Sequence, residues 1–345
     1  MEVGFRSWSC ALRLPFLLCA SLLLAGAFVA CGEDDSGPGS LTVYSGRSEE
    51  LVAPIIEQFA DAMGIQVDVR YAGTAALAAT LLEEGGNSPA DVFFAQDPGG
   101  LGAVEDLLEP LPQSVLDLAP EWARSPEGLW VGTSGRARTL VYNTENVTEA
   151  DLPDDIGGLT DPKWKGRIGW APTNGSFQAM VTAMRSRWGE DATRDWLEGI
   201  QANEPIVYPK NTPQVAAAAA GEIDVGMVNH YYLHRFLAEE GDSFKARNYH
   251  PRGGGPGALV MVAGVGILST AGNKDNANRF IEFLLSLAAQ QYFASQTFEY
   301  PLVEGVVTQR GLTPIEEINN PLITPREMAD LEGTQALLRD VGITP

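Results

Sequence analysis

Residues 41–71 read LTVYSGRSEELVAPIIEQFADAMGIQVDVRY and predict a strand, a helix and a second strand in succession. The apolar run at 41–45 favours a strand, and Ser48 is expected to cap a helix whose first turn is acidic. Gly64 is expected to end that helix, because glycine adopts the left-handed conformation of a helix terminus without strain. Alternating polarity over 65–71 then predicts a strand with one buried face.

Strand and helix patterns alternate through the rest of the chain. Further helices are expected over 75–84, 176–188 and 191–200, and further strands over 91–95, 139–142, 167–170, 222–228 and 258–268. Strands that alternate with helices indicate an α/β protein, in which each lobe is a mostly parallel sheet with flanking helices.

The N-terminus has the composition of an export signal. Residues 1–30 combine a charged start with an apolar run over 14–30. That run is short for a membrane span and no stop-transfer pattern follows it, so we expect it to be removed. Cys31 is placed like the lipidated cysteine of a bacterial lipoprotein, with a tether over 31–40; ordinary secretion with Cys31 as a bystander is the alternative. The protein is therefore expected outside the cytoplasm, either periplasmic or lipid-anchored at the outer face of the cytoplasmic membrane.

The chain is strongly acidic. Its 45 Asp and Glu residues outnumber its 23 Lys and Arg residues, which gives a formal charge of −22. This excess argues against binding nucleic acid or an anionic membrane through a basic face, so membrane contact is expected only through a lipid anchor. Cys10 and Cys19 lie inside the signal, so the remaining chain is expected to contain no internal disulfide and no thiolate metal site.

The roughly 300 residues after the signal exceed a comfortable single core and suggest two lobes. The apolar strands at 139–142 and 258–268 could pass between them. We expect an N-lobe of residues 41–135 and 263–312, and a C-lobe of residues 136–262 and 313–345. Two lobes joined by two crossing strands form the architecture of a hinge-closing binding protein.

Polar residues follow several of the expected strands. They occupy the segments 45–47, 96–97, 174–176 and 229–232. Because open α/β sheets bind ligands at the carboxyl ends of their strands, we expect these segments to surround one cleft. Tyr231 and Tyr232 fall at a strand-to-helix turn, where two adjacent phenols can both point into a cleft. Neighbouring side chains on a helix are about 100° apart, so the alternative is one packed and one exposed tyrosine.

Seven motifs spread over nearly the whole chain carry a family resemblance. They are VYSGR at 43–47, SPADVFF at 88–94, SGRARTLVYNT at 134–144, PKWKGRIG at 162–169, APTNGSF at 171–177, GEID at 221–224 with the tyrosine pair, and PGAL at 256–259. In these motifs the chain resembles the bacterial ferric-iron-binding proteins, which deliver Fe(III) to an ABC-type importer. The resemblance implies a type II periplasmic-binding-protein fold with two crossover strands, and iron held by Tyr231 and Tyr232.

The chemistry agrees with this implication, because Fe(III) is a hard cation that prefers anionic oxygen donors such as phenolate. Tyr142 matches a tyrosine that supplies a third phenolate in one branch of the family; the alternative is a core tyrosine on a strand. Other members place a histidine at the position of Ser48 and a glutamate at the position of Gln96, and both are absent here. Their absence favours the branch with three tyrosines and a bound anion.

In that branch a carbonate-like anion fills the remaining coordination positions, with phosphate as the alternative. Arg47, Arg136 and Arg138 are candidates to hold it, because guanidinium groups grip two oxygens of a planar anion; at least one is expected to be an ordinary surface or salt-bridge arginine. The turn at Asn174, Gly175 and Ser176 matches a phosphate-binding segment of the family, and simple helix capping is its alternative role. A second layer around the ligands is expected from Ser45, Gly46, Ser48, Gln96, Asn211 and Asn229.

Two other kinds of site fit the sequence less well. His230 and His234 have helical spacing for zinc, but Tyr231 stands where a zinc protease has its glutamate. The motifs of serine hydrolases, phosphate loops and dinucleotide-binding folds are absent. The sequence therefore predicts a monomeric, non-enzymatic Fe(III) receptor that works with an ABC permease and a small anion. The alternatives are a receptor of the same fold for an organic cation, a sugar phosphate or a ferric chelate, and an extracytoplasmic hydrolase.

Overall fold

Nine strands form one continuous sheet in the computed structural model, which describes residues 39–321, 323–324 and 326–345. Their order is β2-β1-β3-β9-β4-β7-β5-β6, and β8 pairs with β4 beside this path. The strands are β1 (Ser40–Ser45), β2 (Gln66–Tyr71), β3 (Val92–Ala95), β4 (Val131–Asn143), β5 (Ile168–Trp170), β6 (Ile206–Val207), β7 (Val225–Asn229), β8 (Ala246–Tyr249) and β9 (Val260–Ile267). The α-helices are α1 (Glu49–Met63), α2 (Thr74–Glu84), α3 (Pro98–Ala103), α4 (Gln113–Leu116), α5 (Gly175–Trp188), α6 (Glu190–Ala202), α7 (Asn211–Ala220), α8 (Tyr231–Glu240), α9 (Lys274–Leu284), α10 (Leu287–Tyr292) and α11 (Leu331–Asp340).

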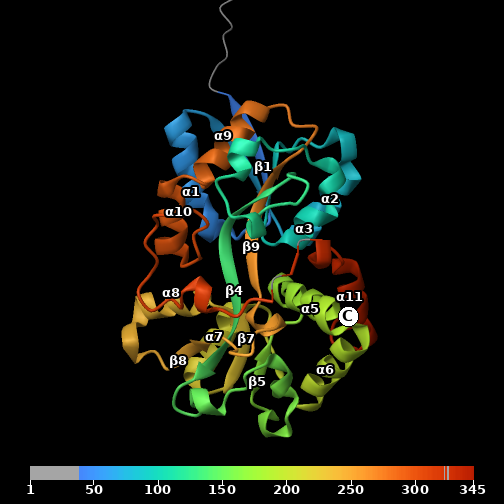
Figure 1. Ribbon diagram of the computed structural model, residues 1–345, viewed down its shortest axis with the longest axis vertical. Helices are drawn as coiled ribbons and strands as arrows, with labels where there is room; N and C mark the ends of the chain where they lie inside the picture. Colours follow the sequence, from blue (N-terminus) through green and yellow to red (C-terminus); the bar gives the residue numbers. More distant parts are fainter. Residues whose placement is uncertain (1–38, 322, 325) are drawn as a thin grey trace, which may run out of the picture. The chain divides into compact units, whose positions relative to one another are not determined.

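Strands β4 and β9 join the two halves of the sheet. β1 pairs in parallel with β2 and β3, and β9 returns antiparallel to β3. β9 also pairs with the first half of β4, whereas the second half of β4 pairs with β7 and β8. In Figure 1 both strands run between an upper group of elements, with α1, α2 and α9, and a lower group, with α5, α6 and α7. The predicted α/β architecture with two crossover strands is confirmed.

Aromatic residues fill a core on each side of the crossing strands. In one half, the ring of Phe280 lies 5.0 Å from that of Phe59 and 6.5 Å from that of Phe94, between centroids. In the other half, Trp170 meets Phe177 edge to face at 5.7 Å. Each half thus has its own core, while contacts join residues 38–345 into one unit. The lobe boundaries given above therefore stay a prediction.

The expected elements occur close to their predicted bounds because their signals are local. Gly64 ends α1 with a φ of 66°, in the left-handed region. Ser48 occupies the N-cap position, but its side chain forms no capping hydrogen bond, so the capping role predicted for its hydroxyl is wrong. The strand predicted over 139–142 is longer than expected, because β4 begins at Val131.

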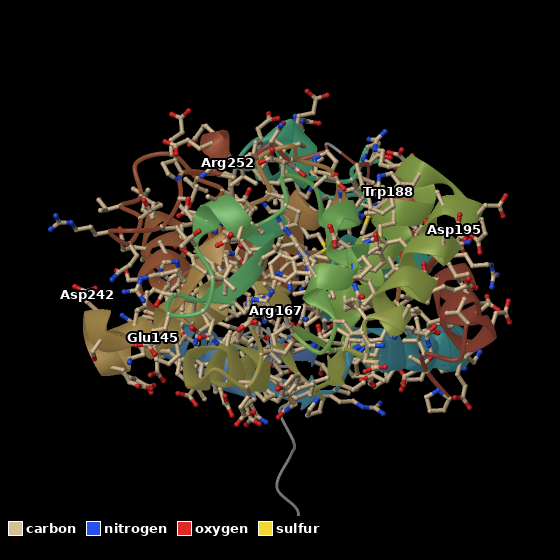
Figure 2. All side chains as sticks on the ribbon, turned by 90° about the horizontal axis from the view of Figure 1, so that it is seen from below. Glu145, Arg167, Trp188, Asp195, Asp242 and Arg252 are labelled. Atoms are coloured by element: carbon tan, nitrogen blue, oxygen red, sulfur yellow. The ribbon has the colours of Figure 1, made fainter. Side chains whose placement is uncertain are left out.

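The export signal predicted at 1–30 and the lipidation of Cys31 concern residues outside the described part of the chain. Within that part, no helix is long and apolar enough to cross a membrane. Seen from below, charged side chains project around the outside of the fold, with Asp195, Asp242 and Arg252 among them (Figure 2). The acidic groups are thus spread over the surface, as expected for a chain with this charge.

Replacing Phe280 with alanine should lower the free energy of unfolding by about 3–5 kcal/mol, because it empties a fully buried position between two aromatic rings. Urea unfolding followed by circular dichroism measures this loss. Val307→Ala is the control, since Val307 is 73% exposed and its truncation should change stability by no more than about 0.5 kcal/mol. Equal effects of the two substitutions would contradict the assigned core.

Candidate functional site

A cleft of about 730 Å³ is lined by residues from both halves of the sheet. One side comes from the loops after β1 and β3, including Gly46 and Gln96. The other side comes from the start of α5 and from α8, including Gly175 and Tyr232. All four predicted polar segments contribute residues to this lining, so their expected convergence is confirmed. The volume lies within the usual range of small-molecule sites.

Tyr231 and Tyr232 occupy the strand-to-helix turn predicted from the sequence. β7 ends at Asn229 and α8 begins at Tyr231. The two rings lie 4.2 Å apart between centroids, with an angle of 31° between their planes. Tyr231 is buried and Tyr232 is half-buried in the cleft lining, so the alternative with one exposed tyrosine does not describe the turn.

The two phenol oxygens have no internal partner. Neither forms a hydrogen bond with another residue of the described chain. Burial, reinforced by the adjacent Tyr232, raises the pKa of Tyr231 well above its ordinary value, and the positive charge of Arg136 opposes this rise. The two phenol groups are therefore available to a partner from outside the chain.

Arg136 and Arg138 place two buried guanidinium groups on β4, within electrostatic reach of the tyrosines. Nη1 of Arg138 donates to Oδ1 of Asn229 at 3.0 Å. Its other two nitrogens, and all three of Arg136, have no hydrogen-bond partner among the described residues. Burial lowers the pKa of Arg138 to about 9, and the two tyrosines oppose this shift. Buried cations without partners are rare because their desolvation is costly, so these groups indicate a place for an anion.

Arg47 has an internal counterion instead. Its Nη2 donates to both carboxylate oxygens of Glu299 at 2.8 Å, and both side chains are almost fully buried. Oγ of Ser134 also donates to Glu299, at 2.8 Å. Arg47 is thus a salt-bridge arginine, yet its Nε and Nη1 are buried without a hydrogen-bond partner among the described residues, so its predicted anion-binding role stays a prediction.

The turn before α5 connects several residues of the predicted anion site. Oδ1 of Asn174 accepts from the backbone N–H of Ser176 at 3.1 Å, and this bond caps the helix. Oγ of Ser176 accepts from Nδ2 of Asn229 at 3.0 Å. Asn211 donates to Asn174 at 3.5 Å, and its own Oδ1 is buried without a partner in the described chain. The capping role is present, and the helix N-terminus at Gly175 also opens on the cleft, where its amides suit an anion.

Tyr142 is not brought to the other two tyrosines. It pairs with Val225 at the start of β7, whereas Tyr231 follows the end of that strand, where Asn229 pairs with Arg138. Tyr142 lies four residue steps along the extended strand from Arg138, a distance of about 13 Å. Tyr142 is buried in the core of the lower half. Its predicted role as a third phenolate ligand is therefore corrected: the register of β4 against β7 makes it a core tyrosine.

Among the residues predicted for the second layer, Ser45 and Gly46 shape the backbone beside the cleft. Oγ of Ser45 accepts from the backbone N–H two residues later, at 3.3 Å, and Thr74 accepts from the N–H of Gln96 at 3.0 Å. A Cβ at Gly46 would lie 2.1 Å from Oγ1 of Thr74, so only glycine fits between β1 and α2. Ser48 and Gln96 line the cleft, and Ser48 is exposed.

Asp97 lines the cleft, as expected for segment 96–97, but no binding role was predicted for its side chain. Its Oδ1 accepts from the N–H of Gly100 at 3.1 Å, which caps α3. Its Oδ2 lies 3.9 Å from the position that a Cβ of Gly175 would occupy. Burial raises the pKa of Asp97, and the nearby charge of Arg136 opposes this rise. The place of Asp97 after a predicted strand was the available sequence signal.

His230 is not available as a zinc ligand, because both of its ring nitrogens have hydrogen-bond partners. Nδ1 of its buried ring accepts from the backbone N–H of Ala137 at 3.1 Å, and Nε2 lies 2.8 Å from the carbonyl oxygen of Phe298. In the described part of the chain, no group of three or more His, Cys, Asp or Glu residues is arranged to hold a metal ion. A metal in the cleft would therefore depend on the tyrosines.

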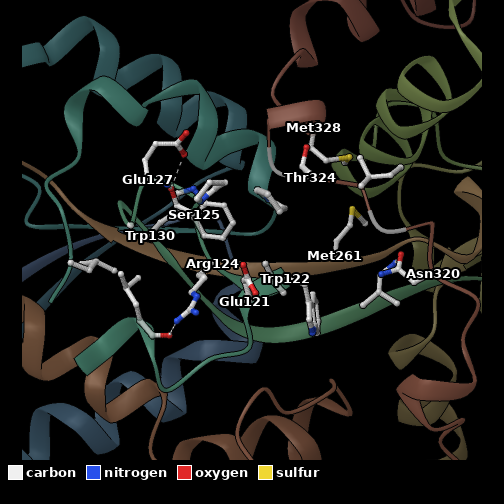
Figure 3. A pocket seen from close by; sticks show the side chains of 18 of the residues that line it. Glu121, Trp122, Arg124, Ser125, Glu127, Trp130, Met261, Asn320, Thr324 and Met328 are labelled. Atoms are coloured by element: carbon white, nitrogen blue, oxygen red, sulfur yellow. Dashed lines mark hydrogen bonds between the residues drawn. The ribbon is translucent and has the colours of Figure 1, made fainter. Parts of the chain in front are cut away.

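A larger hollow of about 910 Å³ lies away from the tyrosine pair. Figure 3 shows Trp122, Trp130, Met261 and Met328 around it. Its lining contains two glutamates among apolar and aromatic side chains, and no tyrosine. Neither of the paired tyrosines lines this hollow, whereas Tyr232 lines the cleft of about 730 Å³, which therefore remains the candidate site and is called the tyrosine cleft below.

Several known proteins are similar to this chain in sequence and in fold. A model of the family described as bacterial extracellular solute-binding protein matches residues 87–326. The major ferric iron-binding protein of Neisseria meningitidis serogroup B is 36% identical over 330 residues, which cover 93% of this chain and 97% of that protein. Iron-bound HitA from Pseudomonas aeruginosa has a TM-score of 0.84 and 34% identity, covering 88% of this chain and 100% of that one. IdiA (FutA) from Trichodesmium, in complex with iron and citrate ligands, has a TM-score of 0.76 and 30% identity, covering 89% and 100%.

The crossover strands, the cleft and these similarities define a substrate-binding protein of the type II periplasmic-binding-protein fold. The chain belongs to the bacterial extracellular solute-binding proteins, and among them to the family of ferric-iron-binding proteins. The resemblance seen in the sequence motifs is thereby confirmed. These relatives are binding proteins rather than enzymes.

Replacing Glu299 with glutamine should lower the free energy of unfolding by about 3–5 kcal/mol, because it leaves the buried charge of Arg47 without a counterion. Urea unfolding at pH 7 measures the loss. Glu145→Gln is the matched control, since Glu145 pairs with Lys245 on the exposed surface (Figure 2) and its loss should cost no more than about 1 kcal/mol. A Glu299→Gln protein as stable as the control would show that Arg47 is compensated by other groups.

Proposed function

We propose that this protein captures ferric iron in the tyrosine cleft, with Tyr231 and Tyr232 as phenolate ligands and an anion between the metal and the arginines of β4. One observation carries the proposal: two phenols without hydrogen-bond partners lie within electrostatic reach of two buried, largely unpartnered guanidinium groups. Phenolate is a strong donor for Fe(III), and guanidinium binds planar oxyanions. A metal and an anion bound together would satisfy both sets of groups.

The charges of the site favour an anion with two negative charges. Two phenolates and the carboxylate of Asp97 carry three negative charges, against three positive charges on iron and two on Arg136 and Arg138. The excess of two positive charges matches carbonate or hydrogen phosphate. A low-dielectric cleft penalises uncompensated charge strongly, so this balance supports a synergistic anion. The relative with bound citrate makes a polycarboxylate the alternative to test.

In the proposed mechanism, movement about the two crossing strands allows the protein to capture iron and deliver it. Rotation about β4 and β9 would bring the loops after β1 and β3 against α5 and α8, and the closed form would be the one that an ABC permease recognises. In this mechanism the boundaries between N-lobe and C-lobe fall where the two strands cross. Relatives named as periplasmic support a location outside the cytoplasm, with Cys31 as the proposed lipid anchor. No chemical reaction is required of the protein.

A receptor of the same fold for another solute is the second candidate. The cleft volume of about 730 Å³ favours it over a bare ion, because that space would hold a ferric chelate or another small organic anion. Direct phenolate coordination distinguishes the two, since it produces a visible charge-transfer band only when the tyrosines bind iron. An enzymatic role has no observation in its favour.

Titration of metal-stripped protein with Fe(III) in bicarbonate buffer should give a visible band that saturates at one iron per chain. Tyr231→Phe and Tyr232→Phe should each abolish or strongly weaken it, because each removes a phenolate. Tyr142→Phe is the matched control and should leave the band intact, since Tyr142 lies in the core of the lower half. A flat spectrum from folded wild-type protein, or bleaching by Tyr142→Phe alone, would contradict the proposal.

Iron binding should weaken as pH falls. Burial raises the pKa of Tyr231 above its ordinary value near 10, so its phenol is protonated in the metal-free protein at pH 7 and must lose its proton when iron binds. With two phenolates, the apparent affinity should fall by roughly 100-fold per pH unit below neutrality. A competition titration against a chelator of known pH dependence measures the slope. An affinity independent of pH between 6 and 8 would show that phenolates are not the ligands.

A further inference from the structure

We propose, resting on the function above, that His230 is a positioning residue that fixes Tyr231 relative to the strand carrying both arginines. His230 directly precedes Tyr231 and is fully buried. Its ring meets the ring of Tyr231 edge to face, at 5.7 Å and 85°. The imidazole therefore packs against the flank of the phenol, where it can set the direction of the side chain.

The two ring nitrogens of His230 are held by backbone groups from distant parts of the chain. Nδ1 accepts from the N–H of Ala137 at 3.1 Å, so the neutral ring carries its proton on Nε2. Nε2–H then donates to the carbonyl oxygen of Phe298 at 2.8 Å. The backbone N–H of His230 also donates to the carbonyl oxygen of Ala137, at 3.0 Å. Both the ring and the main chain of His230 are thus tied to the residue between the two arginines of β4.

The corner at residues 297–300 completes this support. A π-helical turn, Phe293–Thr297, leads to Phe298, whose φ of 58° is unusual for a residue with a side chain. Tyr300 then pairs with Gly135 of β4 through two backbone hydrogen bonds, at 2.7 and 2.9 Å. The ring of Tyr300 stacks on His230 at 4.6 Å between centroids. An unfavourable backbone conformation persists where surrounding contacts hold it in place. Here the contacts come from His230 and from β4.

At position 230, only an imidazole makes both ring-nitrogen hydrogen bonds together with the ring contacts to Tyr231 and Tyr300. Phenylalanine would keep the stacking and the contact with Tyr231 but would leave the N–H of Ala137 and the carbonyl of Phe298 unpaired. Asparagine would retain at most the acceptor, and glutamine at most the donor. Tyr231 would then lose its fixed orientation toward the guanidinium groups of Arg136 and Arg138, although the fold could persist.

The test compares wild type, His230→Phe, His230→Asn and His230→Gln in the same Fe(III) titration, at a temperature well below the melting point of each metal-free protein. We expect His230→Phe to shift the visible band and weaken iron binding at least 10-fold per folded molecule, with the Asn and Gln variants intermediate. Trp196→Phe is the control, because it removes one buried hydrogen bond, to the carbonyl oxygen of Ile156 at 3.0 Å, in the core of the lower half and outside the cleft lining. It should lower the melting temperature without moving the band.

A wild-type band and affinity in His230→Phe would overturn the inference while leaving iron capture intact. If that variant does not fold, wild-type behaviour of both His230→Asn and His230→Gln would overturn it equally. If the band shifted in proportion to lost stability in Trp196→Phe as well as in the His230 variants, that result would also contradict a positioning role. Absence of a band in wild-type protein would instead remove the proposed function, so the two failures are distinct.

Discussion

Positive charge buried on one strand constrains the rest of this structure. β4 carries two guanidinium groups into the interior that form no salt bridge among the described residues, whereas a third, from the loop after β1, pairs with Glu299. Desolvating a cation costs several kcal/mol unless it is paired, so this arrangement is stable only if a ligand or the cleft solvent compensates it. The tyrosine pair, the N-terminus of α5 and the carboxylate of Asp97 are all placed around that charge. In the proposed function, a metal and an anion bound together compensate this charge.

In the proposed mechanism, β4 also forms part of the hinge. Because β4 crosses between the halves of the sheet, its first part pairs with β9 and its last part with β7. Tyr231 directly follows β7, and its ring packs in the core of the half that contains α1 and α9. In the proposed mechanism the anion and the tyrosines form a preorganised half-site, and closure excludes water from it. Preorganisation of this kind raises affinity by lowering the cost of ordering the ligands on binding.

The sequence predicted elements and site residues correctly where their positions depend on neighbouring residues in the chain. The alternation of strands and helices, the glycine that ends α1 and the tyrosine pair after β7 all depend on neighbouring residues, and the structure contains each of them. It was insufficient where strand register or distant partners decide. Tyr142 is a core residue because of its pairing with Val225, and Arg47 is neutralised by a residue 252 positions away. No local pattern marks Glu299 or the contacts of His230, so their roles could be read only from three-dimensional neighbours.

The most direct test is anomalous diffraction at the iron absorption edge from crystals of the iron-loaded protein. The account predicts one strong peak in direct bonding contact with the phenol oxygens of Tyr231 and Tyr232, with density for an anion between the metal and the guanidinium groups of β4. A peak coordinated by surface carboxylates, with the two phenols still unliganded, would contradict it.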